Sequence, residues 1–309
     1  MAVTLAEIQA AQARIAHMIL RTPVITDPMG SGLILKAEYL QRTGSFKLRG
    51  AANRVIRAVE EGARHVVTGS SGNHGQAVAY VARQLGIKAT VVVPEDANPV
   101  KVRGMQQSGA RVEFCGLTSN ERLARAAEIT RTEGAVFVPP YDDPFVMAGQ
   151  GTAGLEILEQ VQRVPVVYVP IGGGGLISGV ATAIKESNPA VRVVGVEPEL
   201  ANDTYLSRQR GEIVDIGASR TIADGLRTSH PGSLTFPVVQ RYVDEIVLVS
   251  EAEIRTACRY LLINMKQVVE PSGAVSVAAA LRAGGEAVAL VSGGNLDLDA
   301  VAGVPVWEA

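Results

Sequence analysis

The sequence predicts an α/β protein made of two doubly wound, open α/β domains. Short apolar segments that suit buried strands alternate with longer amphipathic segments that suit helices along most of the chain. Such alternation is typical of parallel sheets with helices on both faces. A turn rich in proline and aspartate, residues 139–144, interrupts the alternation, which then restarts. We therefore expect a domain boundary at this turn.

The first part of the chain opens with an amphipathic helix over residues 5–20, which Arg21-Thr22-Pro23 ends. A strand over 33–37 and a helix that begins near Lys47 follow. From residue 65 onward strands and helices alternate strictly. We expect strands at 65–68, 89–93, 111–114 and 135–138, and helices at 74–85, 99–108 and 120–132.

After the turn, the alternation resumes with a helix over 146–162 and a strongly apolar strand over 164–169. We expect further strands at 192–196, 246–249 and 287–291, and helices at 176–186, 251–265 and 272–282. The N-terminal helix is expected to pack on this second layer. We expect a large domain formed by residues 1–52 and 143–309, a small mobile domain formed by residues 53–142, and no C-terminal regulatory domain.

Composition narrows the class of protein. The 309 residues are 47% hydrophobic and 19% charged, with a formal net charge of -2, so no basic face for nucleic acid is expected. No apolar run approaches the ~18 residues that a membrane span needs, and the N-terminus lacks the pattern of a secretory signal. Two distant cysteines, Cys115 and Cys258, fit a reducing compartment better than a disulfide. We therefore expect a cytoplasmic protein without nucleic-acid or membrane partners.

Lys47 stands at an unusual place for a structural lysine. Ser45 is the expected N-cap of a helix whose apolar face includes Leu48 and Val55, which puts Lys47 in the first turn. The positive end of the helix dipole disfavours a cation there and lowers the pKa of an amine. A lysine that attacks carbonyl groups needs such a low pKa, because only the free amine is nucleophilic. Taken alone, the position would also suit a solvated surface lysine.

Four glycines, Gly172 to Gly175, join an apolar strand to the helix that starts at Leu176. Glycines let the backbone approach a ligand closely, and successive free N–H groups at a helix start bind anions. The pattern is not a dinucleotide fingerprint, because Ile177 replaces the third glycine, nor is it a P-loop, because no Gly-Lys-Ser/Thr follows. A merely tight turn needs fewer glycines, so a phosphate site is favoured.

Polar residues follow two other predicted strands. The segment from Ser70 to Gly75 offers two hydroxyls, an amide side chain and free N–H groups at the carboxyl end of a strand, where open α/β sheets bind ligands. This set suits a carboxylate, although an ordinary N-cap cluster is an equal alternative. Ser292, Gly293 and Gly294 follow the last strand, and alone they would indicate only a loop.

Glu197 and Asp203 lie six residues apart in a segment that is not expected to be helical. Two carboxylates and a backbone carbonyl could chelate a hard cation. From spacing alone, a simply solvated acidic loop is the stronger interpretation. The histidines at 17, 65 and 230 show no spacing typical of a metal site or a triad, and the chain has no GxSxG elbow of a serine hydrolase.

Taken together, these segments resemble the fold-type II pyridoxal-phosphate enzymes, which share the tryptophan synthase β-like fold, and in particular the serine/threonine dehydratase and serine racemase group. The matching pieces come in the family's order and span most of the chain. They are Gly44–Ala51, Ser70–Gln76, Ala148–Thr152, Gly172–Leu176, Thr221–Gly225 and Val291–Asn295. One departure is Pro139, where the family often has a histidine.

The resemblance implies a role for each matching residue. Lys47 forms the internal aldimine with the aldehyde of pyridoxal 5'-phosphate, which lies in the cleft between the domains. Gly172, Gly173, Gly174, Gly175 and Leu176 hold the phosphate, Asn73 donates to the ring hydroxyl, Phe46 packs by the ring and Ser292 meets the pyridine nitrogen. The substrate side of the site comprises Ser70, Ser71, Asn73, His74 and Gly225, with Ser71 on the cofactor face opposite Lys47.

The resemblance also implies a reaction. Lys47 takes the Cα proton of an amino acid, the β-hydroxyl departs with help from the cofactor phosphate, and the released enamine hydrolyses to ammonia and a 2-oxoacid. A serine at the pyridine nitrogen makes the ring a weaker electron sink than an aspartate would, which favours prompt elimination. L-Threonine would give 2-oxobutyrate, and L-serine would give pyruvate.

Two other activities of the group remain open at this point. Serine racemisation would use Ser71 as the second acid/base, and 3-hydroxyaspartate dehydration would use Arg122 for the second carboxylate. In racemase-like members, the stretch that corresponds to 197–203 binds magnesium or calcium. The resemblance therefore implies Glu197, the Ala201 carbonyl and Asp203 as metal ligands, and it implies a homodimer.

Overall fold

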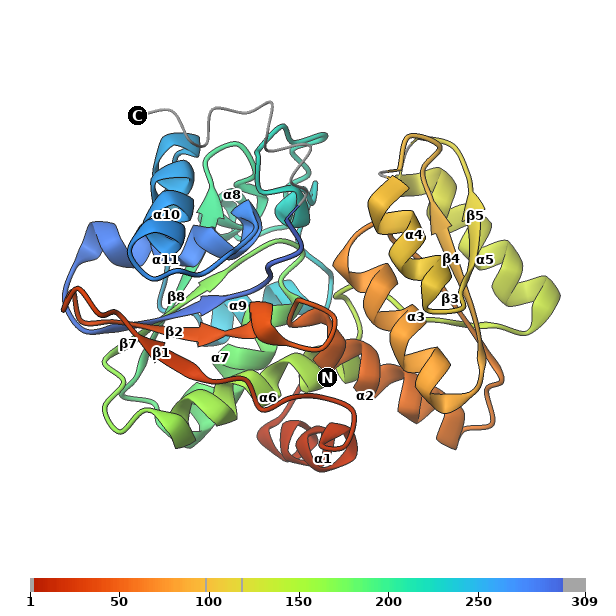
Figure 1. Ribbon diagram of the computed structural model, residues 1–309, viewed down its shortest axis with the longest axis horizontal. Coiled ribbons are helices and arrows are strands. Elements are labelled where there is room, and N and C mark those ends of the chain that lie inside the picture. The colour runs from red at the N-terminus through yellow and green to blue at the C-terminus, as the bar shows by residue number, and fades with distance from the viewer. Residues whose placement is uncertain (1–2, 98, 118, 297–309) are drawn as a thin grey trace.

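The computed structural model describes residues 3–97, 99–117 and 119–296. In this part of the chain the strands form two sheets, one of six strands and one of four. Figure 1 shows the two sheets side by side, each with its own helices, and α2 (Lys47–Glu60) between them. The prediction of an α/β fold with two parallel sheets is therefore confirmed.

The larger sheet has the order β1-β2-β10-β7-β8-β9. All neighbours are parallel except β1 and β2, which are antiparallel. The strands are β1 (Val24–Thr26), β2 (Leu33–Ala37), β7 (Val166–Pro170), β8 (Arg192–Pro198), β9 (Glu245–Val249) and β10 (Ala287–Val291).

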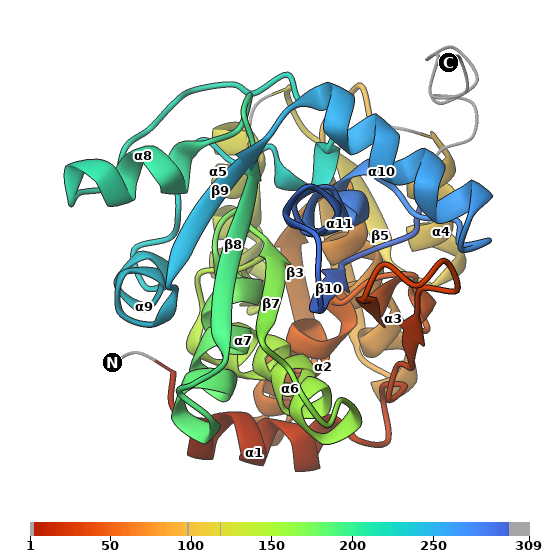
Figure 2. The same cartoon turned by 90° about the vertical axis from the view of Figure 1, so that its left-hand side faces the viewer.

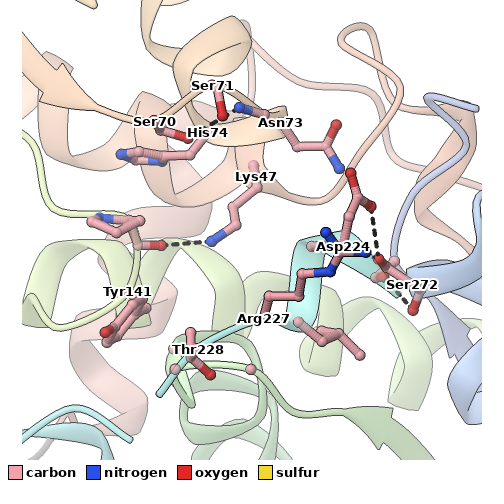
Figure 3. A pocket seen from close by; sticks show the side chains of 18 of the residues that line it. Lys47, Ser70, Ser71, Asn73, His74, Tyr141, Asp224, Arg227, Thr228 and Ser272 are labelled. Carbon is pink, nitrogen blue, oxygen red and sulfur yellow. Dashed lines mark hydrogen bonds between the residues drawn. The ribbon is translucent and has the colours of Figure 1, made fainter. Parts of the chain in front are cut away.

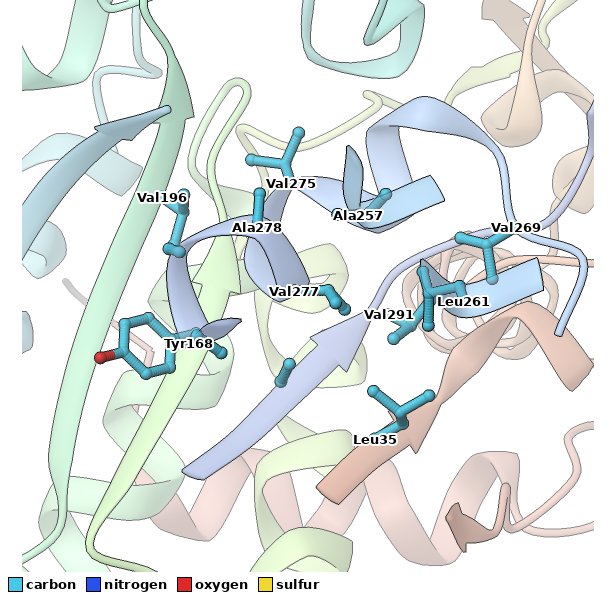
Figure 4. Packing of buried hydrophobic residues seen from close by; sticks show 14 of the residues in the cluster. Leu35, Tyr168, Val196, Ala257, Leu261, Val269, Val275, Val277, Ala278 and Val291 are labelled. Atoms are coloured by element: carbon cyan, nitrogen blue, oxygen red, sulfur yellow. The ribbon is translucent and has the colours of Figure 1, made fainter. Parts of the chain in front are cut away.

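Both faces of the larger sheet are covered, because alternate residues of its strands enter two different cores. Ala289 and Val291 of β10 pack under α10 (Glu251–Ile263) and α11 (Pro271–Ala283), in the cluster drawn in Figure 4. Val288 and Leu290 enter the opposite cluster, with α6 (Pro144–Gln160) and α7 (Gly175–Ser187). On that side α1 (Leu5–Ile15) lies across α6, as expected (Figure 2).

The smaller sheet is parallel throughout, with the order β5-β4-β3-β6. Its strands are β3 (His65–Gly69), β4 (Lys88–Val93), β5 (Arg111–Phe114) and β6 (Val136–Phe137). Helices α2, α3 (Asn73–Leu85) and α4 (Pro99–Gln107) cover one face, and α5 (Ser119–Glu133) covers the other. Both sheets therefore present the carboxyl ends of several parallel strands, where ligands of such folds bind.

Several local predictions are wrong. α1 ends at Ile15 rather than at Leu20, and Ser45 is not an N-cap, because Phe46 occupies the cap position of α2 and makes no side-chain cap bond. Two elements that were not predicted are β1, a three-residue edge strand, and the mostly polar α8 (Asp203–Arg210). Also not predicted are α9 (Thr235–Tyr242), which contains a proline, and two single-turn 3-10 helices, η1 (Glu38–Leu40) and η2 (Asp224–Leu226).

Two further predictions concerned membrane-spanning segments and the two cysteines. None of the helices in the described ranges is both long and apolar enough to cross a membrane. Cys115 and Cys258 are free thiols, and each is half-buried rather than part of the core.

Candidate active site

A cavity of about 560 Å³ lies between the two sheets, at the carboxyl ends of β3, β7 and β10. Residues from both sheets line it (Figure 3). The cavity brings together all the residues predicted to bind cofactor or substrate: Phe46, Lys47, Ser70, Ser71, Asn73, His74, Arg122, Gly172, Gly173, Gly174, Gly175, Leu176, Gly225 and Ser292.

Lys47 is the first residue of α2, and its half-buried side chain points into the cavity (Figure 3). Its Nζ donates to the Pro140 carbonyl at 2.7 Å and lies 5.2 Å from the centroid of the Phe46 ring. Burial lowers the pKa of this amine to about 8. A substantial fraction of Lys47 is therefore a free amine slightly above neutral pH, as a nucleophilic lysine requires.

The backbone before Lys47 is fixed to the larger sheet. The Phe46 N–H donates to the Ser292 carbonyl at 3.0 Å, and Ser45 forms an isolated antiparallel bridge with Gly293. Ser292 directly follows β10, is buried, and its hydroxyl donates to the Ser272 carbonyl at 3.3 Å. These contacts place the lysine next to the end of β10.

The four glycines form a cradle that larger residues would fill. A Cβ on Gly173 would lie 2.4 Å from ring atoms of Tyr141, and one on Gly175 would lie 2.9 Å from the Tyr141 Cα. Gly174 has φ +89, and a Cβ there would lie 2.7 Å from the Thr235 hydroxyl. Because α7 begins at Gly175, the first N–H groups of that helix have no intrahelical acceptor. The turn thus offers the dipole and donors that suit a phosphate.

The loop after β3 makes a second group of donors. The first intrahelical bond of α3 runs from the Gln76 N–H to the Gly72 carbonyl, so the preceding N–H groups at the helix start are available to an anion. A Cβ on Gly75 would lie 2.3 Å from the Ser70 carbonyl, so this tight turn requires glycine. Ser70 and Ser71 line the cavity above Lys47 (Figure 3).

The His74 ring lies at the cavity but has no N–H group to donate into it. It is buried, and its Nε2 lies 3.0 Å from the Val138 carbonyl, which can only accept, so Nε2 carries the proton. Burial, with a smaller contribution from Lys47, lowers the pKa of His74 to about 3, so the ring is neutral. His74 can therefore offer an anion its backbone N–H, but not its ring.

The Asn73 amide belongs to a chain of hydrogen bonds that was not predicted from the sequence. Its Nδ2 donates to Glu270 at 2.7 Å, and its Oδ1 accepts from Asn295 at 2.7 Å. The Asn295 Nδ2 also donates to the Thr43 carbonyl at 2.9 Å. A Cβ on Gly293 would lie 2.2 Å from a Glu270 oxygen, so the glycine makes room for this carboxylate. The two partners fix the Asn73 amide in one orientation.

Among the other lining residues, Tyr141, Arg227 and Ser272 were not predicted. Tyr141 lies against the glycine turn, and its pKa is raised by burial and by the negative charges of Asp142 and Asp203. On the opposite wall the Gly225 N–H donates to the Ser272 hydroxyl at 2.9 Å, and the Arg227 Nε donates to the Thr221 carbonyl at 2.7 Å. The only sequence signal for this wall was the matching segment 221–225.

Arg122 reaches the cavity from α5, on the side of the smaller sheet. Its Nη1 donates to the Leu117 carbonyl at 3.3 Å, and burial lowers the pKa of the guanidinium. A cation is therefore present on the wall that carries Ser70 and Ser71.

The residues predicted to bind a metal lie outside the cavity, where β8 leads into α8. Glu197 and Asp203 are fully buried, and Glu197 accepts from the backbone N–H groups of Thr204 at 3.0 Å and Tyr205 at 2.8 Å. Neither carboxylate oxygen of Asp203 has a hydrogen-bond partner in the described structure. Burial raises the pKa of Glu197 to about 8, with Asp203 as the second cause, and burial raises the pKa of Asp203 to about 7.

These two carboxylates fit a cation, because a positive charge would satisfy the orphaned Asp203 oxygens and favour ionisation of both groups. Within the described ranges, however, no cluster of three or more His, Cys, Asp or Glu side chains could hold a metal. A cation here would therefore need the backbone carbonyl of Ala201 and water as further ligands.

The fold and the cavity together define the class of protein: an α/β protein whose ligand-sized cavity between two sheets is lined by an amine of lowered pKa and by a glycine turn of a shape that suits an anion. The family model described as "Pyridoxal-phosphate dependent enzyme" matches residues 15–293. The chain belongs to this family.

Individual relatives agree with this assignment. The L-threonine ammonia-lyase of Geobacter sulfurreducens is 44% identical over 305 residues, which cover 95% of this chain and 76% of the relative. The structure of a threonine deaminase from T.th. has a TM-score of 0.91 and 44% identity over 95% of this chain and 99% of that one. Maize serine racemase has a TM-score of 0.92 and 37% identity, with 97% and 96% coverage.

Proposed function

We propose that this protein is a pyridoxal-phosphate-dependent ammonia-lyase that converts L-threonine to 2-oxobutyrate and ammonia, and L-serine to pyruvate and ammonia. The observation that carries the proposal is the cavity that Lys47, the glycine turn and the Ser70–His74 loop line together. The similarity to L-threonine ammonia-lyases and a threonine deaminase supports this substrate class.

The cradle of Gly172 to Gly175, with Leu176, would hold the cofactor phosphate through backbone N–H groups. Phe46 would pack beside the ring, Asn73 would donate to the ring hydroxyl, and the Ser292 hydroxyl would meet the ring nitrogen. Bound there, pyridoxal phosphate supplies an electron sink for the pair of electrons left on Cα when its proton departs. The Ser292 hydroxyl cannot protonate the ring nitrogen as a carboxylic acid would, which favours elimination of a β-leaving group.

The chain's own groups would then position the substrate and move its proton. The hydroxyl of Ser70 and the N–H groups of Asn73 and His74 bind the α-carboxylate, which orients the Cα–H bond toward the Lys47 Nζ. Lys47 accepts that proton as a free amine. We also propose that residues 53–142 close over residues 1–52 and 143–309 to exclude water, with Gly225 on the opposite wall of the substrate site.

A substrate panel tests the proposed reaction. The enzyme saturated with cofactor should release equimolar ammonia and 2-oxoacid from L-threonine and L-serine, whereas D-serine should give a much lower rate. In both L-amino acids the Cα–H bond points toward Lys47, whereas in D-serine it points away. The D-isomer should therefore lose its Cα proton more slowly. Coupled reduction of the 2-oxoacid measures the rate. Absence of 2-oxoacid from both L-amino acids would refute the lyase assignment.

The same panel should include both 3-hydroxyaspartate diastereomers, because Arg122 gives the cavity a cation for a second carboxylate. Release of 2-oxoacid from either of them, at a rate above that with L-threonine and lost in Arg122→Met, would establish 3-hydroxyaspartate dehydration instead.

Racemisation of serine is the second candidate, favoured by the position of Ser71 in the cavity and by the similarity to maize serine racemase. We expect Ser71→Ala to suppress formation of D-serine by at least about 100-fold, a loss typical of a removed general acid/base, while elimination falls much less. Chiral chromatography and the 2-oxoacid assay measure the two rates. Ser70→Ala is the matched comparison, because it removes a carboxylate contact only. Equal loss of both reactions in Ser71→Ala would contradict the two-base role.

We further propose that Glu197, the Ala201 carbonyl and Asp203 bind Mg²⁺ or Ca²⁺, which fixes the start of α8. EDTA should lower the melting temperature of the wild type by at least about 3 °C relative to Mg²⁺ or Ca²⁺, because the cation binds only the folded state. Asp203→Asn should not respond to either ion or to EDTA. In EDTA this variant should match or exceed the wild type in stability, since one of two mutually repelling buried carboxylates is gone.

Glu212→Gln, a change at an exposed glutamate in the following loop, is the control and should keep the wild-type response. Identical melting temperatures of the wild type in EDTA and in both ions would refute the cation site. A homodimeric state and a cytoplasmic location stay predictions, which light scattering and cell fractionation would test.

A further inference from the structure

Behind the cavity, four charged side chains form a buried cluster that we call the Arg49 network: Lys36, Glu38, Arg49 and Glu156. None of them lines the cavity. The side chains of Lys36, Glu38 and Arg49 are 0% exposed and that of Glu156 is 4% exposed. The mechanism proposed above uses none of these charges, so their burial needs a separate explanation.

Arg49 lies at the centre of this network and uses all five of its N–H groups. Its Nε and Nη2 donate to the two Glu38 oxygens, each at 2.7 Å. Its Nη1 and Nη2 donate to the two Glu156 oxygens at 2.7 and 2.8 Å. The remaining Nη1 hydrogen reaches the Thr152 hydroxyl at 3.0 Å. Two bidentate carboxylate contacts fix both the position and the plane of the guanidinium.

The second cation, Lys36, binds the outer side of the same cluster. Its Nζ donates to Glu156 at 2.5 Å, to the Thr22 carbonyl at 2.8 Å and to Gln160 at 2.8 Å. Two positive and two negative charges therefore balance inside the protein. The positive charge of Arg49 lowers the pKa of Glu38 against the opposing effect of burial, so this carboxylate remains ionised.

The network joins the helix that carries Lys47 to three other segments. Arg49 belongs to α2, two residues after Lys47, while Lys36 belongs to β2, Glu38 to η1 and Glu156 to α6. α2 and α6 also touch at glycines: a Cβ on Gly149 would lie 2.5 Å from the Arg49 carbonyl and 2.7 Å from the Gly50 Cα. The first turn of α2 is thus held in one register against α6 and the end of β2.

Stability alone is a weak reason for such a network. Taking charges out of water is costly, and well-packed apolar side chains often replace a buried ion pair with no loss of stability. What apolar packing does not provide is the fixed direction that paired hydrogen bonds impose. The residue whose direction matters here is Lys47, two residues before Arg49 in the first turn of α2.

We propose that Arg49 is a positioning residue: held by Glu38 and Glu156, it fixes the first turn of α2 so that the Lys47 amine points into the cavity. This inference rests on the proposed role of Lys47 as the cofactor lysine. The bridge of Ser45 with Gly293 holds the chain on the other side of Lys47. Lys47 is therefore held from both directions along the backbone, while its own side chain stays able to react.

Arg49→Lys tests the proposal, because a lysine keeps the positive charge but cannot form two bidentate hydrogen-bonded contacts with carboxylates. Glu38→Gln is the second variant, since it keeps the shape and removes one charge-assisted pair. Ile157→Ala is the matched control: it destabilises the same helix, α6, from a fully buried position outside the network. Urea is added at a low concentration to the more stable proteins, so that all variants are compared at the same melting temperature.

Two readouts are measured on the full chain. Competitive acetylation followed by peptide mass spectrometry gives the apparent pKa of the Lys47 amine without cofactor, and absorbance gives the dissociation constant of pyridoxal phosphate. In Arg49→Lys and Glu38→Gln we expect the apparent pKa of Lys47 to rise by about one unit and the dissociation constant to increase about tenfold, the ratio that one pKa unit represents. Ile157→Ala should leave both values within about twofold of the wild type.

Equal changes in Ile157→Ala and in the two network variants would overturn the proposal and leave the network a purely structural feature. Failure of the proposed function is distinguishable from this result. A wild type that binds no cofactor would refute the proposed enzyme, while the acetylation profile of Lys47 would still decide whether Arg49 positions the amine.

Discussion

Lys47→Ala is expected to abolish the visible absorbance of the covalently bound cofactor and to lower the rate of 2-oxoacid formation by at least about 1,000-fold. Losses of this size follow removal of a covalent nucleophile that also transfers a proton. The structure supplies the physical reason, because burial lowers the pKa of this amine to about 8 and its Nζ faces the cavity. Absorbance spectra and steady-state rates measure the two effects.

The prediction has a pH dependence with a definite sign. Below about pH 8 the Lys47 amine of the cofactor-free protein is mostly a protonated ammonium, and above it the free amine predominates. The rate at which the protein takes up pyridoxal phosphate should therefore rise with pH and level off above about pH 8, as seen by stopped-flow absorbance. A rate that keeps rising toward pH 10 would show that the amine has an ordinary pKa.

Two control variants separate charge from nucleophilicity. Lys47→Arg keeps a cation at the same place, but its guanidinium is not deprotonated in proteins, so it should be as inactive as Lys47→Ala. Lys88→Ala removes an exposed lysine of β4 and should behave as the wild type. Activity retained in Lys47→Arg would contradict covalent catalysis by this residue.

The second large effect is expected from Gly174→Ala, which should weaken cofactor binding by at least about 100-fold. At φ +89 an alanine is strained by roughly 1–2 kcal/mol, and its Cβ would also lie 2.7 Å from the Thr235 hydroxyl. That hydroxyl donates to the Gly173 carbonyl at 2.7 Å, so its displacement would move the turn that is proposed to hold the phosphate. Absorbance titration of the cofactor-free protein gives the dissociation constant.

Gly211→Ala is the matched control for this change. Gly211 has φ +77 but no heavy atom within 4 Å of a Cβ, and it ends α8 away from the cavity. It should show the loss of stability from backbone strain, measured by urea unfolding, without any loss of cofactor affinity. If both variants lost affinity equally, strain elsewhere in the protein, rather than the shape of the cradle, would explain the effect.

The sequence was sufficient to predict the residues that follow strand ends. The glycine turn and Lys47 lie at the starts of helices, where a phosphate site and an amine of low pKa follow from local structure. Ser292 alone indicated only a loop, and its role was implied by the resemblance to a family. The alternation of strands and helices likewise predicted both sheets, because apolar strands and amphipathic helices leave distinct periodicities.

What the sequence did not predict depends on contacts between distant segments. Glu270 reaches Asn73 from 197 residues away, and Tyr141 lies over the glycine turn through the path of the chain between β6 and α6. The expectation of Ser45 as an N-cap failed because the chain bends toward Gly293 and α2 starts two residues later. Arg49 resembled any polar residue of an amphipathic helix, and only the folded chain brings it between Glu38 and Glu156.

The position of α2 has a mechanical consequence. Leu48, Ala51 and Val55 pack in the core of the smaller sheet, whereas Arg49 and Gly50 contact α6 beneath the larger one. A rotation of one sheet toward the other would then pivot about this shared helix, and points close to a pivot travel least. The amine of Lys47 would stay almost still during such a rotation, while the loop with Ser70 and Ser71 would sweep toward it.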